Sequence, residues 1–240
     1  MSSEPAAATS RLERLFRATE EENRRVVLRM LPRGRGGELL DIGTHRGEFA
    51  ARVAERVGAT HVAGIELLEE HADVARARGF EVVCANIDDG LPFADEAFDT
   101  VHANQVIEHV RRSDAFLSEV RRVLRPGGLA LISTNNFSSW HNVGALALGY
   151  QPMPAHVSDE LIVGNPLDPR RGWEHEDGRA HLRLFTGRAL IELCAVHGLE
   201  RVALRTAGYY PLPPRLGRAA ARVDRLHGAF LVALLRRPLH

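Results

Sequence analysis

ELLDIGTHRG, at residues 38–47, is the stretch of this sequence that decides the fold. An apolar run of strand length ends here in a short loop with two glycines, and the apolar spacing of a helix follows from Phe49. Glycine takes left-handed backbone angles and lets a ligand approach the main chain, so a glycine loop after a strand is typical of a binding site. The stretch predicts a strand–loop–helix unit with a ligand at the carboxyl end of the strand.

Two acidic residues near this loop indicate the kind of ligand. A loop that binds a dinucleotide reads G-x-G-x-x-G, whereas this one reads D-x-G-x-x-x-G, with Asp41 two residues before Gly43. A carboxylate at that position repels a diphosphate and suits a cationic ligand. Glu66 ends the next apolar run, about 20 residues beyond the loop, where a carboxylate accepts hydrogen bonds from both ribose hydroxyls. These residues favour a nucleoside with a positive charge, and a capped loop without a ligand is the alternative.

Strand and helix patterns alternate on both sides of this unit. The apolar runs of strand length are ELLDI (38–42), HVAGIEL (61–67), FEVVCAN (80–86), FDTVHAN (98–104) and GLALIST (128–134). Helical patterns lie between them at 49–57, 68–77 and 115–124, and Ser10 can cap an earlier helix that runs to about Leu31. This alternation predicts a parallel sheet that is covered by helices on both faces.

The rhythm changes after Thr134. Residues 136–180 hold both tryptophans, several prolines and glycines and no clear period, so we expect an insertion that covers the site as a lid or as a fixed wall. Thr186 then caps a helix that runs to His197, and two strands follow near 200–205 and 229–235.

The composition excludes several kinds of chemistry. All 31 basic residues are arginines, so Schiff-base catalysis and the lysine of a nucleotide-binding P-loop are excluded. The 31 acidic residues balance them, which argues against a nucleic-acid partner. Cys84 and Cys194 stand in apolar stretches, as reduced thiols do, and the longest apolar run, 229–235, is too short to span a bilayer. We therefore expect a cytoplasmic protein that contacts no membrane.

Taken together, several motifs resemble the class I S-adenosylmethionine-dependent methyltransferases that act on small molecules. They are DIGTHRG (41–47), GIEL (64–67), ANIDDGLPFADEAFDTVHANQVIEHV (85–110), RVLRPGG (122–128) and LALISTNN (129–136), and more loosely HLRLFTGRALIELCAVHGLERV (181–202). The resemblance implies an α/β, Rossmann-like sheet of seven strands, mostly parallel with the last antiparallel, with helices on both faces and an insertion after strand five. It implies one methyltransferase domain over residues 1–240. Its parts would be an N-terminal helix (10–31), a cofactor-binding core (38–135), a substrate-side insertion (136–180) and a C-terminal helix with strands (181–240).

The resemblance also implies which residues bind S-adenosyl-L-methionine. They are Asp41, Gly43, Thr44, Gly47, Glu66, Leu67, Asn86, Ile87 and Asn104. Asp41, Gly43 and Thr44 would meet the methionine end of the cofactor, Gly47 would permit the turn into the helix, and Glu66 would bind the ribose. Leu67 and Ile87 would enclose the adenine, and Asn104 would contact the aminocarboxypropyl arm. The sequence departs from the family at His45, where a glycine is usual, and at Asn86, where an aspartate is usual.

Candidate catalytic residues lie after the fourth strand and after the insertion. With lysine absent and the cysteines in apolar stretches, histidine and carboxylate remain as bases for an acceptor hydroxyl. Glu108 and His109 are adjacent, and Gln105 shares their face if this is a helical turn. His181 should return to the same region. We take Glu108, His109 and His181 as the candidate catalytic residues, and a purely structural role for the Glu–His pair is the alternative.

The same residues resemble a metal site. In the ubiquinone-type O-methyltransferases and the small-RNA 3′-terminal 2′-O-methyltransferases, Glu-x-x-Glu-His and a later histidine hold a divalent metal that polarises the hydroxyl. Here Gln105 replaces the first glutamate, which leaves one carboxylate and two imidazoles, a poor ligand set for magnesium. We therefore expect no metal, and activity that survives chelation.

The expected acceptor is a hydroxyl, or an amine, of a small molecule such as a specialised metabolite, a glycan unit or a lipid precursor. The insertion offers aromatic residues that could line its pocket or form a small core of their own: Trp140, His141, Tyr150, His156, Trp173 and His175. An RNA end is an alternative acceptor, for which Arg111-Arg112 and Arg121-Arg122 would have to form a basic groove. The other alternative is a non-catalytic S-adenosylmethionine-binding protein, favoured if His109 and His181 lie away from the pocket.

Overall fold

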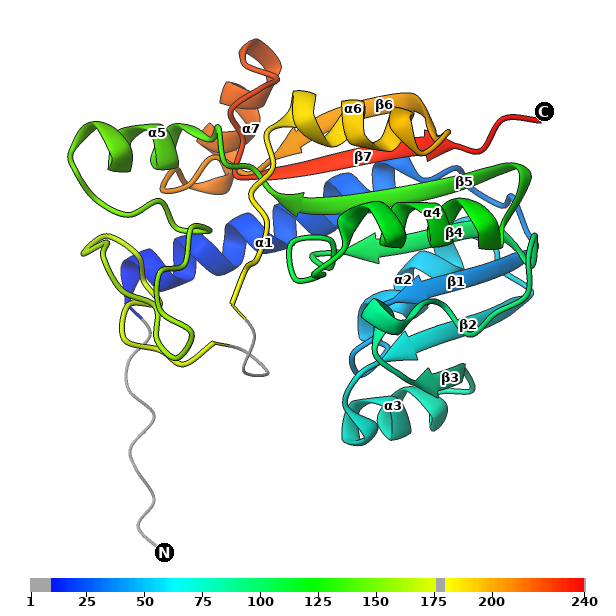
Figure 1. Cartoon of the computed structure of the whole chain (residues 1–240). Coiled ribbons are helices and arrows are strands. Elements are labelled where there is room, and N and C mark those ends of the chain that lie inside the picture. The colour runs from blue at the N-terminus through cyan, green and yellow to red at the C-terminus, as the bar shows by residue number, and fades with distance from the viewer. Residues whose placement is uncertain (1–9, 176–179, 240) are drawn as a thin grey trace, which may run out of the picture.

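The computed structural model describes residues 10–175 and 180–239 of the chain. A seven-stranded sheet forms its centre, in the order β3-β2-β1-β4-β5-β7-β6 (Figure 1). The strands are β1 (Glu38–Ile42), β2 (His61–Glu66), β3 (Glu81–Cys84), β4 (Phe98–Asn104), β5 (Leu124–Asn135), β6 (Glu200–Ala207) and β7 (Phe230–Arg236). β7 runs antiparallel to both β5 and β6, and the other pairs are parallel. The predicted Rossmann-like, mostly parallel sheet with an antiparallel last strand is confirmed.

Helices cover both faces of the sheet, as predicted. They are α1 (Arg11–Met30), α2 (Glu48–Val57), α3 (Glu69–Arg76), α4 (Ser113–Val123), α5 (Trp140–Ala147), α6 (Gly187–Val196) and α7 (Pro214–Val223), with a short 3-10 helix η1 (Ile87–Asp89). Behind the sheet in Figure 1, α1 and α2 close one apolar core with Val27 and Val53. In front of it, α4 and α6 close the other with Leu117 and Leu190. Strands buried on both faces require near-continuous apolar runs, which is how the sequence reads.

Local capping signals set the helix ends. The Ser10 side chain accepts a hydrogen bond from the Glu13 amide at 3.1 Å, and the Thr186 side chain accepts one from the Ala189 amide at 3.4 Å. Gly198 follows α6 with a left-handed φ of 69°, which glycine adopts without strain. All three signals could be read from the sequence, and all three hold.

The insertion contains one helix that the sequence did not predict. Residues 136–180 have no clear period in the sequence, yet residues 140–147 form α5. Hydrogen bonds of the Asn142 side chain fix this helix. The side-chain nitrogen donates to the backbone carbonyl of Asn136, and the side-chain oxygen accepts from the backbone amide of Met153, both at 3.0 Å. Such polar anchoring leaves no apolar period in the sequence. Loops follow, with one bridge between Leu161 and Glu174, and residues 176–179 lie outside the described part.

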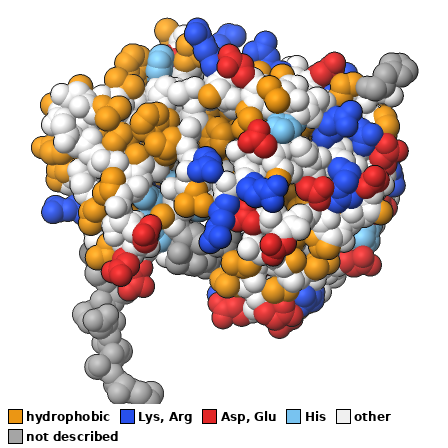
Figure 2. Space-filling view, in the orientation of Figure 1, with side chains coloured by type: hydrophobic (Ala, Val, Ile, Leu, Met, Phe, Trp, Pro, Cys, Tyr) orange, Lys and Arg blue, Asp and Glu red, His pale blue; other side chains and the backbone are white. Residues whose placement is uncertain are grey.

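Many apolar side chains of the insertion are exposed. They gather at the left of Figure 2 and are Trp140, Val143, Leu146, Leu148, Tyr150, Val157, Leu161, Val163, Leu167 and Trp173. Of the large apolar side chains between residues 148 and 175, only Met153 and Ile162 are buried. The insertion therefore contributes little to the apolar core. Among the described residues, no helix is both long and apolar enough to cross a membrane.

Candidate active site

A cleft of about 750 Å³ lies over the carboxyl ends of β1, β2 and β4. Gly43, Glu66 and Asn104 come from these strand ends, and the loop after β4 adds Glu108 and His109. The insertion closes the opposite side with His156, Trp173 and His175, and His181 follows it. Strand ends at the point where a parallel sheet changes winding direction are where such folds bind ligands.

The glycine loop after β1 and the end of β2 form one hydrogen-bonded unit. The carboxylate of Glu66 accepts bonds from the amides of His45 at 2.7 Å, Leu67 at 2.9 Å and Leu68 at 3.1 Å. Three amide donors hold the carboxyl group in place at the edge of the cleft, with its remaining lone pairs available for a ligand. At Gly43, which has a φ of 73°, a Cβ atom would lie 2.8 Å from a Val106 methyl. The loop therefore needs glycine at this position.

His45 replaces the usual glycine without breaking the loop. Its backbone is left-handed with a φ of 49°, and its ring packs on His71 with the centroids 4.0 Å apart. The left-handed angle explains why glycine is the more common choice here. The side chain points towards α3 and occupies the rim of the cleft.

A second hollow of about 420 Å³ adjoins the main cleft behind the glycine loop. Both hollows are lined by Arg24, Gly43, His45 and Asn104, so they meet at the end of β1. Asp41 lies in this second hollow, where its buried carboxylate accepts a hydrogen bond from Nδ1 of His102.

The structure brings together most of the residues that the sequence nominated for the cofactor. Gly43, Glu66, Leu67, Asn86, Ile87 and Asn104 line the main cleft, and Asp41 and Thr44 line the second hollow. Gly47 lines neither: it caps α2 with a φ of 80°, where a Cβ atom would lie 3.0 Å from the Phe80 ring. Asn86 caps η1 by accepting a hydrogen bond from the Asp88 amide at 3.0 Å.

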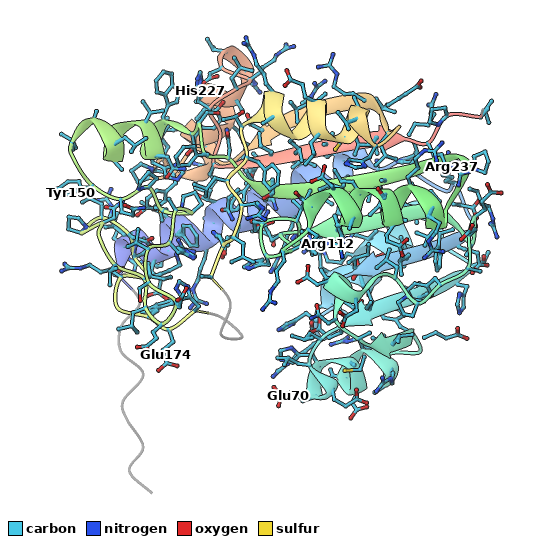
Figure 3. All side chains as sticks on the ribbon, in the orientation of Figure 1. Glu70, Arg112, Tyr150, Glu174, His227 and Arg237 are labelled. Atoms are coloured by element: carbon cyan, nitrogen blue, oxygen red, sulfur yellow. The ribbon has the colours of Figure 1, made fainter. Side chains whose placement is uncertain are left out.

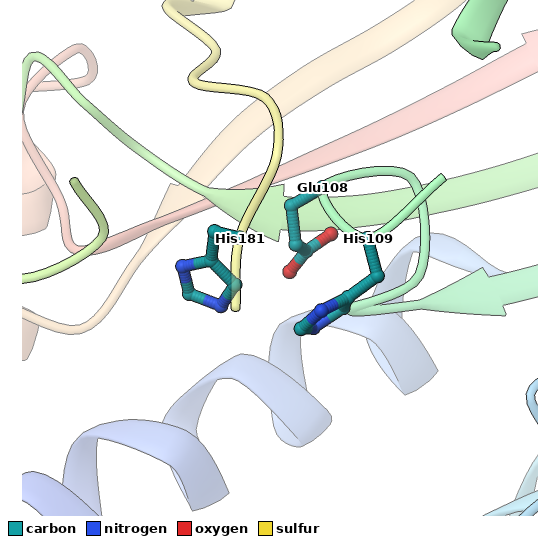
Figure 4. Close-up of side chains that lie close together, drawn as sticks. All are labelled: Glu108, His109 and His181. Carbon is teal, nitrogen blue, oxygen red and sulfur yellow. The ribbon is translucent and has the colours of Figure 1, made fainter. Parts of the chain in front are cut away.

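Glu108, His109 and His181 converge in the cleft (Figure 4). One side-chain ligand atom of each lies within 4.8 Å of the others. Residues 105–110 form a turn rather than a helix, with a φ of 58° at Gln105. The Glu108 carbonyl accepts hydrogen bonds from the amides of Leu182, at 2.8 Å, and Arg183, at 3.1 Å. Those bonds hold the segment after the insertion against the turn, which is why residues far apart in sequence meet.

The Glu108 side chain is buried among hydrogen-bond donors. Its two oxygens accept bonds from the Thr134 hydroxyl at 2.9 Å and the Asn135 amide at 3.3 Å. When the side-chain amide of Gln105 is oriented with its nitrogen towards Glu108, that nitrogen also donates to Oε1 of Glu108, at 3.2 Å. Burial nonetheless raises the pKa of Glu108 to about 7, because desolvation outweighs these donors. Glu108 can therefore exchange a proton near neutral pH.

Two of the cleft histidines are held neutral in fixed tautomers. The ring nitrogen Nδ1 of His181 donates to the Pro154 carbonyl at 3.1 Å, so Nε2 keeps its lone pair. Nδ1 of His156 accepts a bond from the His181 amide at 3.0 Å, so Nε2 carries the proton. Burial lowers the pKa of His181 to about 2 and that of His156 to about 4, and neighbouring imidazoles add to both shifts. Nε2 of His181 is therefore an acceptor, which faces the Asn135 amide nitrogen at 3.5 Å, and Nε2 of His156 is a buried donor without a partner among the described residues.

Half of the aromatic set from the insertion reaches the cleft. His156 stacks on His181 and on His175, with ring centroids 4.3 Å and 4.4 Å apart, and Trp173 stands beside them. The other three line neither hollow. Trp140 stacks on His227, His141 packs against Tyr210, and Tyr150 lies at the outer end of the insertion (Figure 3).

α1 forms a wall of the cleft that the sequence did not reveal. It contributes Glu13, Phe16, Arg17, Glu20 and Arg24. A buried bridge anchors it: the Asn23 amide donates to Asn104 at 3.0 Å, and the Ser133 hydroxyl donates to Asn23 at 3.0 Å. The only sign of this wall in the sequence is a set of polar residues at helical spacing. A helix face that is exposed to solvent has the same pattern.

The arginines that an RNA acceptor would need lie outside both hollows. Arg122 is paired with Glu119 at 2.7 Å and Asp95 at 2.7 Å. Arg121 packs on Gly198, and none of Arg111, Arg112, Arg121 or Arg122 lines either hollow.

Comparisons with known proteins agree on one family. A family model described as a methyltransferase domain matches residues 15–204. A Mycolicibacterium smegmatis protein described as a probable S-adenosylmethionine-dependent methyltransferase is 33% identical over 205 residues, which cover 81% of this chain and 75% of that protein. This chain belongs to that methyltransferase family, whose members use S-adenosylmethionine.

Other comparisons cover less of the chains or have lower identity. The biotin biosynthesis bifunctional protein BioHC of Cellvibrio japonicus is 29% identical over 157 residues, 64% of this chain, and the match spans 26% of that protein. A solved Thermotoga maritima structure, described as a possible histamine N-methyltransferase, covers 95% of this chain and 93% of its own with a TM-score of 0.61 and 21% identity. At that identity the likeness shows the fold alone.

Proposed function

We propose that this methyltransferase acts on a hydroxyl group of a small molecule, with Glu108 as the base. One observation carries the proposal: a buried carboxyl with a pKa of about 7 faces the two imidazoles of His109 and His181 inside the cleft. A general base is most effective when its pKa lies near the working pH.

The residues at the strand ends fit S-adenosylmethionine. Glu66 offers an anchored carboxylate to the ribose hydroxyls, and Leu67 and Ile87 offer apolar contacts to the adenine. Gly43 lets the glycine loop pack closely against Val106 at the edge of the cleft, since a Cβ atom there would meet that side chain. When bound, the cofactor supplies an electrophilic methyl group, whose bond to sulfur breaks as the bond to the acceptor oxygen forms.

The chain's own contribution is to position the acceptor and take its proton. Ionised Glu108 accepts the proton as the hydroxyl oxygen becomes a nucleophile, and Thr134 and Asn135 hold the carboxylate in place. His181 stays neutral, and its Nε2 lone pair faces the Asn135 amide nitrogen at 3.5 Å, which helps to keep Asn135 beside Glu108. His181 itself is too weak a base for this step, because its pKa is about 2.

We propose that the reaction uses no metal. The oxygens of Glu108 already accept hydrogen bonds from the protein. Together with His109 and His181, Glu108 gives a set of possible metal ligands that contains a single carboxylate. Magnesium and calcium prefer oxygen ligands, of which this set is short.

An amine is the second candidate acceptor. Glu13, Glu20 and Glu174 line the cleft and would attract a cationic amine. The hydroxyl is favoured because an amine needs only to lose a proton before it reacts, whereas a hydroxyl needs a base at the reacting atom.

The test measures S-adenosylhomocysteine release with catechol, phenol, histamine and ethanolamine phosphate as probe acceptors. We expect turnover with a hydroxylated probe, a rate that rises with pH through about 7, and a loss of kcat on the order of 100-fold in Glu108→Gln. Calorimetry should show unchanged S-adenosylhomocysteine affinity for that variant. Activity should survive excess chelator.

Three results would contradict the proposal. Turnover with the amine probes only would assign the amine. Full activity of Glu108→Gln would remove Glu108 from catalysis. Loss of activity in chelator that magnesium or manganese restores would assign a metal to Glu108, His109 and His181.

A further inference from the structure

We propose that α7 and the adjoining start of α5 form a surface that docks on an anionic phospholipid bilayer, with α7 lying in the headgroup region. α7 joins β6 to β7, and α5 follows β5. Both helices stand at the same end of the molecule (Figure 1), because β5 and β6 end in register with Phe230, the first residue of β7. The inference depends neither on the acceptor nor on the proposed function.

α7 has an apolar stripe that points into solvent. Leu216 and Val223 are seven residues apart, so they share one face of the helix, and they are 58% and 91% exposed. Leu226, in the turn that follows, is 63% exposed. The one buried residue of α7 is Gly217, which lies against Tyr209. Apolar side chains that are exposed together in this way mark an interaction site.

Each of these three apolar residues follows an exposed arginine. The pairs are Arg215-Leu216, Arg222-Val223 and Arg225-Leu226. Within residues 10–175 and 180–239, the side chains of these three arginines form no ion pair and no hydrogen bond. Arg218, on another side of the same helix, is instead paired with Glu22 at 3.1 Å. The apolar stripe is therefore bordered by unpaired positive charge.

The one acid between residues 207 and 229, Asp224, joins α7 to α5. Its carboxylate accepts hydrogen bonds from the Trp140 indole at 2.6 Å and from the Leu226 amide at 2.8 Å. Trp140 begins α5 and is exposed together with Val143 and Leu146 of the same helix. No charged residue occurs from 140 to 158. The apolar surface of α7 thus continues through Trp140 onto an uncharged helix.

An anionic bilayer matches both features of this surface. Its negative potential attracts arginines, and leucine, valine and tryptophan side chains enter the boundary between headgroups and acyl chains. A second copy of the chain fits less well, because a symmetric contact would bring the arginines of both copies together with only Asp224 to balance them.

This mode of contact needs no segment that crosses the membrane. The longest apolar run, 229–235, is too short to span a bilayer, but a helix that lies in the headgroup region needs no such run. Docking of this kind replaces the expectation that the protein contacts no membrane.

The experiment measures binding of the full chain to two kinds of vesicle by sedimentation. One kind contains phosphatidylcholine alone, and the other contains phosphatidylcholine and phosphatidylglycerol at about 3:1. We expect binding to the mixed vesicles and little to the neutral ones. The triple variant Arg215→Ala, Arg222→Ala and Arg225→Ala should lower the partition coefficient on the order of 100-fold, because three cations leave the surface.

A second triple variant is the matched control, with Arg33→Ala, Arg201→Ala and Arg236→Ala. These arginines are exposed and lie at the opposite edge of the sheet: Arg33 precedes β1, Arg201 lies near the start of β6, and Arg236 ends β7. The control removes the same charge from the chain. It should change the partition coefficient by no more than about twofold, since these side chains stay away from the membrane.

A third variant tests the apolar stripe. Leu216→Gln with Val223→Gln should weaken binding to the mixed vesicles roughly tenfold or more, because both side chains leave water on docking. All three variants should keep the Tm of the unchanged protein, since every replaced side chain is exposed.

Several results would overturn the proposal. They are no binding to the mixed vesicles, equal binding to both kinds of vesicle, equal losses in the two arginine triples, and full binding by the variant with glutamine at 216 and 223. A dimer in analytical ultracentrifugation that this last variant dissociates would assign the surface to a second copy instead.

Discussion

Burial of the Glu108 carboxyl group ties the chemistry of this site to the stability of the fold. The side chain is buried between β5 and the turn after β4, with hydrogen bonds from Thr134 and Asn135. A free glutamate ionises near pH 4.5, whereas Glu108 keeps its proton to about 7. The folded protein therefore binds a proton between these two values that the unfolded chain has released.

This difference predicts how stability depends on pH. The contribution of Glu108 is fully present below about pH 4.5 and is lost as the pH rises through about 7. The loss amounts to roughly 3 kcal/mol of unfolding free energy by pH 8. Denaturant unfolding at pH 5 and pH 8 measures it, with Glu108→Gln as the reference that lacks the titration. If both proteins change equally between the two pH values, Glu108 is not the group responsible.

Single residues also mark the limit of what the sequence could predict. Glu66 and Gly43 could be identified because a strand, a glycine and a carboxylate at fixed spacing define their places. Arg24 could not, because nothing in the helix sequence distinguishes an arginine over a hollow from one in solvent. The raised pKa of Glu108 could not be predicted from the sequence either, since it depends on Thr134, Asn135 and the burial of the turn.

Among the elements, the insertion and α1 differ most in how they are held. α1 is fixed by the apolar core and by the buried bridge from Asn23 to Asn104 and Ser133. Between residues 148 and 175, Met153 and Ile162 are the only buried large apolar side chains. Segments with few buried apolar contacts open at low free energy.

We therefore predict that residues 148–175 exchange their amide hydrogens faster than β1 and β4 in the free protein. Bound S-adenosylhomocysteine and acceptor should slow this exchange, because His156, Trp173 and His175 line the cleft that they fill. Hydrogen exchange followed by mass spectrometry provides the comparison, and α6 serves as an internal control that should not change. Protection of 148–175 equal to that of β1 before any ligand is added would mean a fixed wall.

The helices and strands were predicted best where a periodic pattern of apolar residues or a helix-capping residue marks them. The strands, α1, α4 and α6 have apolar spacing and capping residues such as Ser10 and Thr186. α5 was missed because the polar side chain of Asn142 fixes it, and polar contacts made by tertiary structure leave no periodic trace.

At the scale of the molecule, a single ligand in the two hollows would contact both α1 and the ends of the central strands. The two hollows join at Arg24, Gly43, His45 and Asn104, which belong to α1, the glycine loop and β4. A ligand that fills both contacts the helix and the sheet at once. It stabilises only the folded state, because the hollows do not exist in the unfolded chain.

Thermal unfolding should reveal this coupling. At a free concentration of about 100 times its dissociation constant, S-adenosylhomocysteine should add about 2.7 kcal/mol to the unfolding free energy. For a chain of this size, that corresponds to a rise in Tm of about 5–10 °C. Adenosine at the same multiple of its own dissociation constant should give the same rise in Tm. This control checks that the stabilisation depends only on the ratio of ligand concentration to dissociation constant. No rise at saturating S-adenosylhomocysteine would show that the hollows do not bind it in the folded state.

The two tryptophans of this chain, Trp140 and Trp173, both lie in the insertion, one stacked on His227 and one at the cleft. The sheet and the cofactor-side elements contain none. The intrinsic emission of the protein, excited at the red edge of the absorption band, therefore comes from the insertion alone. An unlabelled sample thus carries its own optical probe of the insertion, with Trp173→Phe to isolate the signal at His227 and Trp140→Phe to isolate the signal at the cleft.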